Sequence, residues 1–315
     1  GRCIAGFFSR RSHRPVESDA CKLQPPFFSD IAKDVIAFAN ENEISPYQED
    51  TRTGLLRHIY LRHAEATGEI MVCLVINAEQ FPHADQLVSR LIKRYPGIMS
   101  IVLNINTENT NVILGKRCVT LYGSETITDE LRGVKVQLSA LSFYQVNRQG
   151  AARLYDIVEE EACPDGVRLL LDMYCGAGTI GLSMANRADR LIGVDSVAQA
   201  IENAEQNAVL NGFDNCEFLC ADASQAAAEL SARGLRPDAV ILDPPRKGCD
   251  YECLRAVAQM QPARIVMISC NPATAARDMK TMQQEFGYMA VKATAVDMFP
   301  RTGHVECVVL MSRNI

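Results

Sequence analysis

The chain carries a cysteine in a position that favours nucleophilic chemistry. Residues 269–272 read Ser-Cys-Asn-Pro and follow the run Arg264-Ile-Val-Met-Ile, which predicts a buried strand ending beside Cys270. Asn271 is a good helix N-cap and Pro272 suits the first helical position, so a helix is expected to begin there. The positive end of a helix dipole favours a thiolate over a thiol. Cys270 is therefore predicted to be a nucleophile.

Two other motifs supply groups that such a nucleophile needs. Residues 243–248 read Asp-Pro-Pro-Arg-Lys-Gly, in which two prolines make a rigid turn that lacks N–H donors. Residues 304–306 read His-Val-Glu, and Glu306 opens a strand-like apolar run where a charged side chain is disfavoured. We interpret Glu306 as a carboxylate base, and His304 as a structural or pocket-lining residue rather than a metal ligand.

A glycine-rich segment predicts a nucleotide-type cofactor. Residues 172–181 read Asp-Met-Tyr-Cys-Gly-Ala-Gly-Thr-Ile-Gly, and glycines let a backbone turn tightly beside a ligand. The segment also matches the dinucleotide pattern G-x-G-x-x-G, so NAD remains an alternative. Asp195 closes the next strand, where a carboxylate can accept hydrogen bonds from a ribose. Asp222 suits an adenine edge, and equally suits a helix N-cap. Asp243-Pro-Pro is unusual for NAD enzymes and typical of S-adenosylmethionine (SAM) methyltransferases that act on bases or amides.

The second half alternates strands and helices. Its strands are near-continuous apolar runs, which fit a parallel sheet covered on both faces. Strands are expected at 167–172, 190–194, 216–220, 238–242, 264–269, 288–296 and 305–311. Helices are expected at 146–161, 179–187, 197–211, 222–233, 250–260 and 272–285. A short loop joins the last two strands, so the final strand is expected to be antiparallel in a doubly wound α/β sheet.

The first half predicts an α+β unit that is rich in sheet. Residues 54–77 alternate apolar and polar around Thr67-Gly68, which predicts a β-hairpin. A helix is expected at 84–95, with strands at 98–105, 111–114, 118–122 and 134–138. Residues 151–315 carry 15 Lys+Arg against 22 Asp+Glu, a net charge of −7, whereas residues 1–150 carry 17 against 16, a net charge of +1, which together give the −6 of the chain. Arg10, Arg11 and Arg14 form a basic cluster that could touch phosphates or simply face solvent.

Composition narrows the class of protein. The chain has 315 residues, enough for two domains, with 48% hydrophobic and 22% charged residues. It has no apolar run of transmembrane length and no signal-peptide pattern, so we expect a cytoplasmic protein without a membrane partner. The 12 cysteines are scattered without metal-ligand spacing, which favours reduced, mostly buried thiols and predicts no metal site.

Taken together, these motifs resemble the RNA uracil-5-methyltransferases, which make 5-methyluridine in tRNA and 23S rRNA. The matching segments occur in the family's order: Ser142-Phe-Tyr-Gln-Val-Asn147, Asp172–Gly178, Gly193-Val-Asp195, Asp243–Gly248, Ser269–Pro272 and Gly303–Glu306. The resemblance implies a Rossmann-like class I methyltransferase domain at 146–315. It also implies an N-terminal α+β domain at 1–145 that binds RNA.

The resemblance also implies roles for individual residues. Cys270 matches the nucleophile and Glu306 the base. Phe143 matches an aromatic residue near the target base, and we assign Arg246 to the developing charge on a uracil oxygen. The positions that match contacts to SAM are Gln145, Tyr174, Asp195, Asp222 and Asp243, with Gly176 and Gly178 in the loop.

The sequence leaves alternatives open for the RNA substrate, for an iron–sulfur cluster and for the function. The likeness is greater to bacterial 23S rRNA enzymes, with tRNA as the alternative substrate. Many members hold a 4Fe–4S cluster with four cysteines; Cys21 aligns with the last of them, and Cys3 alone cannot replace the other three, so no cluster is expected. Other candidates are a SAM- and RNA-binding fragment without turnover, and an NAD-linked oxidoreductase. An amino-group methyltransferase would need no cysteine nucleophile. A monomer is expected.

Overall fold

The computed structural model describes residues 2–9, 12, 14–18 and 21–313, and it divides into two compact units. The first comprises residues 1–129 and 138–142, and the second comprises 130–137 and 143–315. The chain therefore changes unit after Ser142, and the short stretch 130–137 belongs to the second unit, which a single division after residue 145 does not include. Arg10 and Arg11 of the basic cluster lie outside the described residues.

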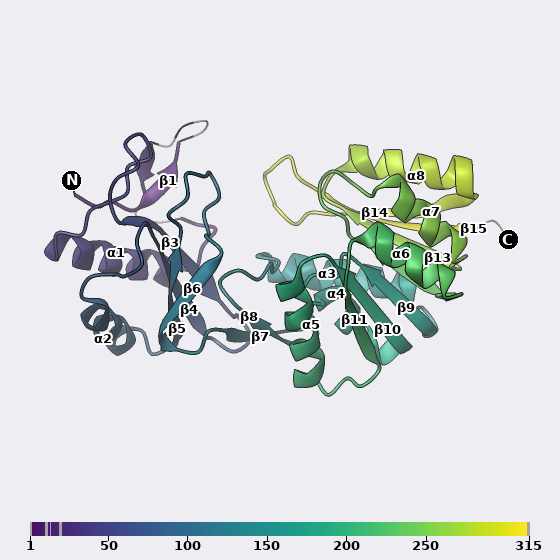
Figure 1. Ribbon diagram of the computed structural model, residues 1–315, viewed down its shortest axis with the longest axis horizontal. Helices are drawn as coiled ribbons and strands as arrows, with labels where there is room; N and C mark the ends of the chain where they lie inside the picture. The colour runs from purple at the N-terminus through teal and green to yellow at the C-terminus, as the bar shows by residue number, and fades with distance from the viewer. Residues whose placement is uncertain (1, 10–11, 13, 19–20, 314–315) are drawn as a thin grey trace. The chain divides into compact units, whose positions relative to one another are not determined.

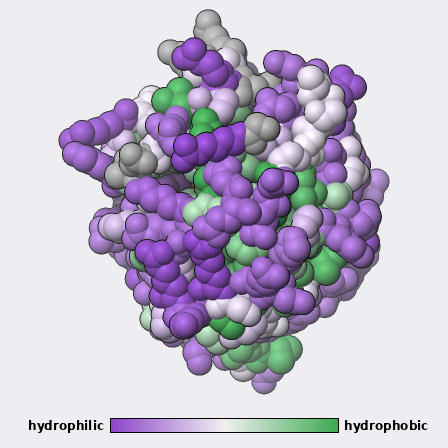
Figure 2. All heavy atoms as spheres, turned by 90° about the vertical axis from the view of Figure 1, so that its left-hand side faces the viewer, coloured by the Kyte–Doolittle hydropathy of each residue, from purple (hydrophilic) through white to green (hydrophobic). Residues whose placement is uncertain are grey.

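The first unit is a four-stranded sheet packed against two helices (Figure 1). Its strands lie in the order β3-β4-β5-β6, with bounds Leu56–His63, Ile70–Ile76, Ile98–Ile105 and Arg117–Gly123. Helices α1 (Pro26–Glu41) and α2 (Ala84–Arg94) share one apolar core with the sheet. The hairpin expected at 54–77 is confirmed as the antiparallel pair β3–β4. Hydrophilic atoms dominate the molecular face in Figure 2, as expected when apolar side chains fill such a core.

Two small antiparallel pairs lie outside the two larger sheets. They are β1 (Gly6–Phe8) with β2 (Pro15–Glu17), and β7 (Ile127–Leu131) with β8 (Val134–Leu138). The strand expected at 111–114 is wrong, because the structure has a loop there. The side-chain amide of Asn106 donates to the carbonyls of Val112 and Ile113, so these carbonyls bond to a side chain instead of a neighbouring strand.

The second unit contains a seven-stranded sheet in the order β11-β10-β9-β12-β13-β15-β14. The bounds of β9 to β15 are Val167–Met173, Ala188–Asp195, Cys216–Cys220, Ala239–Leu242, Arg264–Ser269, Tyr288–Val296 and Glu306–Arg313. Strands β9 to β13 pair in parallel, whereas β15 is antiparallel to both β13 and β14. The doubly wound sheet with an antiparallel last strand is therefore confirmed.

Helices cover both faces of this sheet (Figure 1). One face packs against α6 (Ala223–Ala232), α7 (Tyr251–Gln259) and α8 (Pro272–Phe286) in one apolar cluster. The other carries α3 (Arg148–Ala162), α4 (Thr179–Leu182) and α5 (Ala198–Leu210). The helix expected at 179–187 is shorter, because the chain turns at Ser183 and continues as a 3₁₀ turn, Ala185–Arg187. None of the described helices combines the length and apolar composition needed to cross a membrane.

Candidate active site

The loop after β9 adopts an unusual backbone. Tyr174, Gly176 and Gly178 have φ angles of 65°, 56° and 79°, in the left-handed region that costs L-residues about 1–2 kcal/mol. The loop therefore folds back sharply and leads into α4. The Asp195 carboxylate at the end of β10 accepts the Gly176 N–H at 2.9 Å and the Val197 N–H at 2.9 Å. The structure thus brings together Gly176 and Asp195, two of the residues predicted to hold a cofactor.

The Tyr174 side chain takes a different direction from the loop backbone. Its ring packs against the apolar cluster under α6, α7 and α8. There its hydroxyl meets the thiols of Cys249 and Cys253, and burial raises the pKa of Tyr174. We therefore expect Tyr174 to contact a ligand in the loop through its backbone rather than through its hydroxyl.

A buried carboxylate that was not among the predicted site residues lies beneath the loop. The Asp172 side chain is 1% exposed, and its Oδ2 accepts the Gly181 N–H at 2.9 Å. Its Oδ1 has no hydrogen-bond partner in the described part of the chain. Burial raises the pKa of Asp172 to about 7, and the charge of Asp195 adds to the shift. An acid within the apolar run of β9 is the sequence signal that identifies it.

Asp243 follows β12 at the same edge of the sheet. Burial raises its pKa to about 8, and the negative charges of Asp172 and Glu306 act in the same direction. Close by, the Tyr155 hydroxyl lies 3.0 Å from Thr179 Oγ1, and burial also raises the pKa of Tyr155. The carboxyl ends of β9 and β12 therefore form an acidic, partly dehydrated site.

Cys270 lies where the sequence predicts it, between the end of β13 and the start of α8. Asn271 caps this helix by accepting the Ala273 N–H, and Pro272 occupies the first turn. Ser269 Oγ accepts the Asn271 N–H at 3.1 Å and donates to the Asn271 carbonyl at 3.0 Å. These bonds fix the backbone on both sides of the half-buried Cys270.

The sheet register brings Glu306 to Cys270. Ser269 on β13 pairs with Cys307 on the antiparallel β15, so the next residues in register are Cys270 and Glu306. Glu306 is 9% exposed, and burial raises its pKa. The Arg246 guanidinium, and His304 when protonated, oppose this shift. The predicted nucleophile and base are therefore neighbours, although the chain separates them by a helix and a strand.

The segment after Asp243 is held by α8. The Asp278 carboxylate, 2% exposed, accepts the Cys249 N–H at 2.8 Å, and Arg277 donates to the Lys247 carbonyl at 2.8 Å. Gly248 has φ +82°, and an added Cβ would lie 2.5 Å from the side chains of both α8 residues. Sequence reasoning missed Asp278, because its role depends on the tertiary contact between α8 and this loop.

Arg246 lies in this loop near the nucleophile. Its carbonyl accepts hydrogen bonds from Asn271 Nδ2 at 3.3 Å and Thr274 Oγ1 at 3.4 Å. Its guanidinium Nη2 lies 3.3 Å from His304 Nδ1. Arg246, His304, Cys270 and Glu306 thus come from three segments that meet at one edge of the sheet.

The remaining predicted site residues lie in the segment before α3 and at the start of α6. Phe143 is 77% exposed, and Gln145 is half-buried in the segment that leads into α3. Asn147 caps α3 and donates from Nδ2 to the Met298 carbonyl at 3.0 Å, which ties this segment to the loop between β14 and β15. Asp222 caps α6 by accepting the Ser224 and Gln225 N–H groups, as one of its two interpretations predicts.

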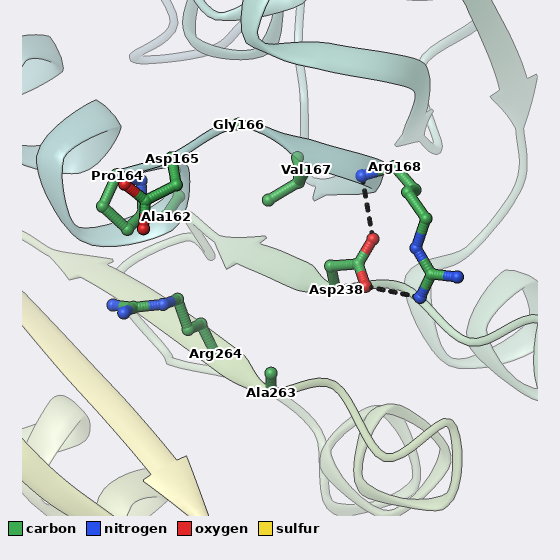
Figure 3. Close-up of a pocket in the computed structure, with 9 residues that line it drawn as sticks. All are labelled: Ala162, Pro164, Asp165, Gly166, Val167, Arg168, Asp238, Ala263 and Arg264. Carbon is green, nitrogen blue, oxygen red and sulfur yellow. Dashed lines mark hydrogen bonds and ion pairs between the residues drawn. The ribbon is translucent and has the colours of Figure 1, made fainter.

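A separate cavity of about 260 Å³ lies at the opposite edge of the sheet, beside the first residues of β9 and β13 (Figure 3). Asp238 here accepts hydrogen bonds from the backbone and the guanidinium of Arg168, so its carboxylate is already paired. None of the predicted site residues lines this cavity. In parallel α/β sheets ligands bind at the carboxyl edge, which favours the site around Cys270.

Two cysteines near the N-terminus, Cys3 and Cys21, lie in the described part of the chain. Cys3 is buried and its thiol donates to the Ile44 carbonyl. In the described ranges of the chain, no three His, Cys, Asp or Glu side chains gather in a way that could hold a metal ion. Cys3 is thus part of the apolar core of the first unit, and Cys21 is half-buried.

The amino-acid sequence is similar to those of known RNA methyltransferases. Residues 122–314 match the family model described as tRNA (uracil-5-)-methyltransferase. An uncharacterized RNA methyltransferase of Halalkalibacterium halodurans is 42% identical over 311 residues, which cover 99% of this chain and 68% of the relative. One from Caldanaerobacter subterraneus is 41% identical over 310 residues, covering 98% and 68%.

Solved structures agree with these sequence matches. The Pyrococcus abyssi tRNA (uracil-54, C5)-methyltransferase, in complex with S-adenosyl-L-homocysteine, superposes with a TM-score of 0.81 at 32% identity. The match covers 97% of this chain and 72% of that one. A putative SAM-dependent methyltransferase from Streptococcus mutans shares the fold, with a TM-score of 0.52 at 12% identity over 89% and 78% of the two chains.

Proposed function

Because this chain belongs to the tRNA (uracil-5-)-methyltransferase family, whose members are SAM-dependent RNA methyltransferases, we propose that it methylates C5 of a uridine in RNA. In this proposal Cys270 is the nucleophile and Glu306 the base. We propose 23S rRNA as the substrate on the likeness of the sequence motifs. A tRNA is the alternative, because the solved relative from P. abyssi acts on uridine 54 of tRNA.

The chemistry of uracil explains the need for both residues. C5 of uracil is a poor nucleophile, and addition of the Cys270 thiolate to C6 moves the electron pair of the C5–C6 bond toward O4 as an enolate. C5 then forms a bond to the methyl group while the bond between that methyl group and the sulfonium sulfur of its donor breaks, with the electron pair staying on the sulfur. Glu306 removes the proton from C5, and the returning electron pair breaks the bond between C6 and sulfur. The cysteine leaves as a thiolate and Glu306 holds the proton.

The observation that carries the proposal is the pairing of β13 with β15. The Ser269–Cys307 pair makes Cys270 and Glu306 the next residues in register. Addition at C6 and proton removal at C5 involve adjacent ring atoms, so the two side chains must lie close together. Glu306 is buried and its pKa is raised, which suits a base that must take a proton from carbon.

The carboxyl edge of the sheet also fits the proposed cofactor. SAM supplies an electrophilic methyl group when bound. The left-handed loop at Gly176 and Gly178 leaves room for close approach of a ligand, and Asp195 is at the position expected for a ribose contact. The unpartnered Asp172 Oδ1 and the Asp243 carboxylate provide acceptors for a cationic group. We propose that these residues, with Gln145 and the backbone of Tyr174, hold SAM.

Arg246 has the charge that the intermediate requires. With C6 at Cys270 and C5 facing Glu306, the next ring atom is C4, which carries the enolate oxygen. A guanidinium near that oxygen stabilises the developing charge, and mutational losses for such groups in other enzymes are about 3–4 kcal/mol. Phe143, which is highly exposed, is proposed to stack on an unstacked base, an interaction typically worth about 1–3 kcal/mol.

The test uses 23S rRNA fragments and tRNA transcribed with 5-fluorouridine. Fluorine cannot leave C5 as a proton, so the covalent intermediate accumulates. We expect a protein–RNA adduct that survives denaturation, requires SAM and is absent for Cys270→Ala. An adduct with one RNA class alone identifies the substrate. Absence of an adduct with SAM binding intact would indicate a binding fragment without turnover, and absence of both would overturn the proposal.

A further inference from the structure

The Arg246–His304 pair has a defined hydrogen-bond polarity. The guanidinium carries only donors and stays charged, so at 3.3 Å its Nη2 donates and His304 Nδ1 accepts. An imidazole that accepts at Nδ1 is neutral and carries its proton on Nε2. The pair therefore combines the positive charge of Arg246 with a hydrogen-bond acceptor on His304.

Both members of the pair are fixed through their backbones. The Arg246 carbonyl is bonded by Asn271 and Thr274, which lie at the start of the helix that follows Cys270. The His304 N–H donates to Thr302 Oγ1 at 3.2 Å, and Glu306 follows two residues later. The backbone of Arg246 is thus tied to residues that directly follow the proposed nucleophile, and His304 lies two residues before the proposed base.

We propose that His304 is a positioning residue that aims the Arg246 guanidinium at the C4 substituent of the target base and so makes the site select uracil over cytosine. This proposal rests on the proposed function. Uracil presents O4, an acceptor, whereas cytosine presents an amino group, a donor. With cytosine bound, the donors of Arg246 would face another donor, and the hydrogen bond that O4 of uracil accepts would be lost.

The chemistry also explains why the partner of Arg246 is a histidine. A carboxylate at this position would orient the guanidinium equally well, but its negative charge would cancel much of the positive charge that the enolate oxygen requires. A neutral imidazole orients the guanidinium and leaves the charge in place. A carboxylate here would also lie near Glu306 and Asp243, two acids whose pKa values are already raised.

The test compares three substitutions of His304. His304→Asn keeps an acceptor near the Nδ1 position, His304→Gln moves the amide toward the Nε2 position, and His304→Leu has no acceptor. His304 is exposed, so all three variants are expected to melt at the temperature of the wild type. The position of the wild-type adduct is first mapped, and short RNA hairpins are then made with 5-fluorouridine or 5-fluorocytidine at that position.

We expect His304→Leu and His304→Gln to form the fluorouridine adduct about 10- to 100-fold more slowly, as for loss of one hydrogen bond to a charged group. The rate ratio of fluorouridine to fluorocytidine should fall, while His304→Asn retains most of both values. The KM for SAM should stay unchanged, because His304 is outside the cofactor loop. An unchanged ratio in His304→Leu, or equal losses in the Asn and Leu variants, would overturn the proposal. Failure of the wild type to form any adduct would instead overturn the proposed function.

Discussion

Replacing Asp278 with alanine tests whether α8 holds the segment that carries Arg246. The carboxylate is 2% exposed and accepts the buried Cys249 N–H at 2.8 Å. Loss of the acceptor leaves this N–H unpaired, at a cost of about 1–3 kcal/mol. The Arg277 side chain is 55% exposed, so its ion pair with Asp278 adds at most about 1 kcal/mol. We expect Asp278→Ala to lower the free energy of unfolding by about 2–3 kcal/mol.

Activity should fall further than stability alone explains. At a temperature where the variant is fully folded, displacement of Arg246 by about 1 Å should slow formation of the fluorouridine adduct on the order of 100-fold. The chain has no tryptophan, so unfolding in urea is best followed by circular dichroism. Asp278→Asn keeps an acceptor for the Cys249 N–H and should lose less than about 1 kcal/mol.

A surface control comes from the same loop. Asp250 forms an exposed pair with Lys247 at 3.8 Å, and Asp250→Ala should change stability by less than about 0.5 kcal/mol. Amide exchange in residues 244–253 provides an independent readout, because the Cys249 N–H should lose its protection in Asp278→Ala only. The reasoning fails if that amide stays protected, or if adduct formation by the folded variant is as fast as in the wild type.

Three further substitutions, one of them with a matched control, test other parts of the site. Glu306→Gln should let the methylated covalent adduct accumulate on ordinary uridine, because the C5 proton cannot be removed; gel analysis that shows free RNA with normal product would contradict the assignment of the base. The pKa of Asp172 is raised to about 7 in the folded protein, whereas in the unfolded chain it is near 4. The contribution of Asp172 to the free energy of unfolding is therefore complete below pH 4 and is lost as the pH rises through 7. From pH 6 to pH 8 the unfolding free energy without ligand should therefore fall by about 1 kcal/mol more in the wild type than in Asp172→Asn, and equal slopes in urea titrations would refute this. Gly178→Ala and Gly212→Ala both place alanine at positive φ and should each lose about 1–2 kcal/mol of stability. Only Gly178→Ala should weaken the affinity for SAM, which calorimetric titration measures. Its added Cβ would lie 3.2 Å from the side chains of Ala204 and Leu182, whereas a Cβ at Gly212 would meet open space.

The sequence predicted the sheet of the second unit well because its strands are long apolar runs followed by polar motifs. Local patterns were less informative in the first unit. The apolar residues of 112–114 suggested a strand, but Arg57, 49 residues before Asn106, donates to the carbonyls of Asn106 and Glu108 and helps to hold the loop. Such long-range side-chain bonds leave no periodic signal. Helix α1 had no prediction, although Pro26 at its first position is a helix-start signal; its N-cap residue, Pro25, provides no side-chain cap.

The site was predictable to the extent that its residues end strands. Asp243 and Cys270 directly follow apolar strands, and Asp195 is the last residue of one, so topology alone assigns them to one edge of the sheet. Asp172 lies inside a strand and Asp278 inside a helix, and their roles depend on which backbone N–H groups they meet. For Asp222 the sequence supported two interpretations equally, a ligand contact and a helix cap. The structure shows the hydrogen bonds of the cap.

Glu306 is the residue for which strand direction matters most. It is the first residue of β15, and in a parallel strand a first residue lies at the amino edge, on the side of the cavity in Figure 3. Because β15 runs antiparallel to β13, its first residue lies instead at the edge where β13 ends and Cys270 follows. The same reversal carries His304, two residues earlier, to Arg246. One antiparallel strand in an otherwise parallel series thus brings the proposed base and the proposed positioning residue to the edge of the sheet where the proposed nucleophile follows β13. For the proposed reaction this arrangement has a further consequence: the proposed base is the first residue of β15 and the proposed nucleophile directly follows β13, so the hydrogen-bonded pairing of these two strands sets the distance between their backbones.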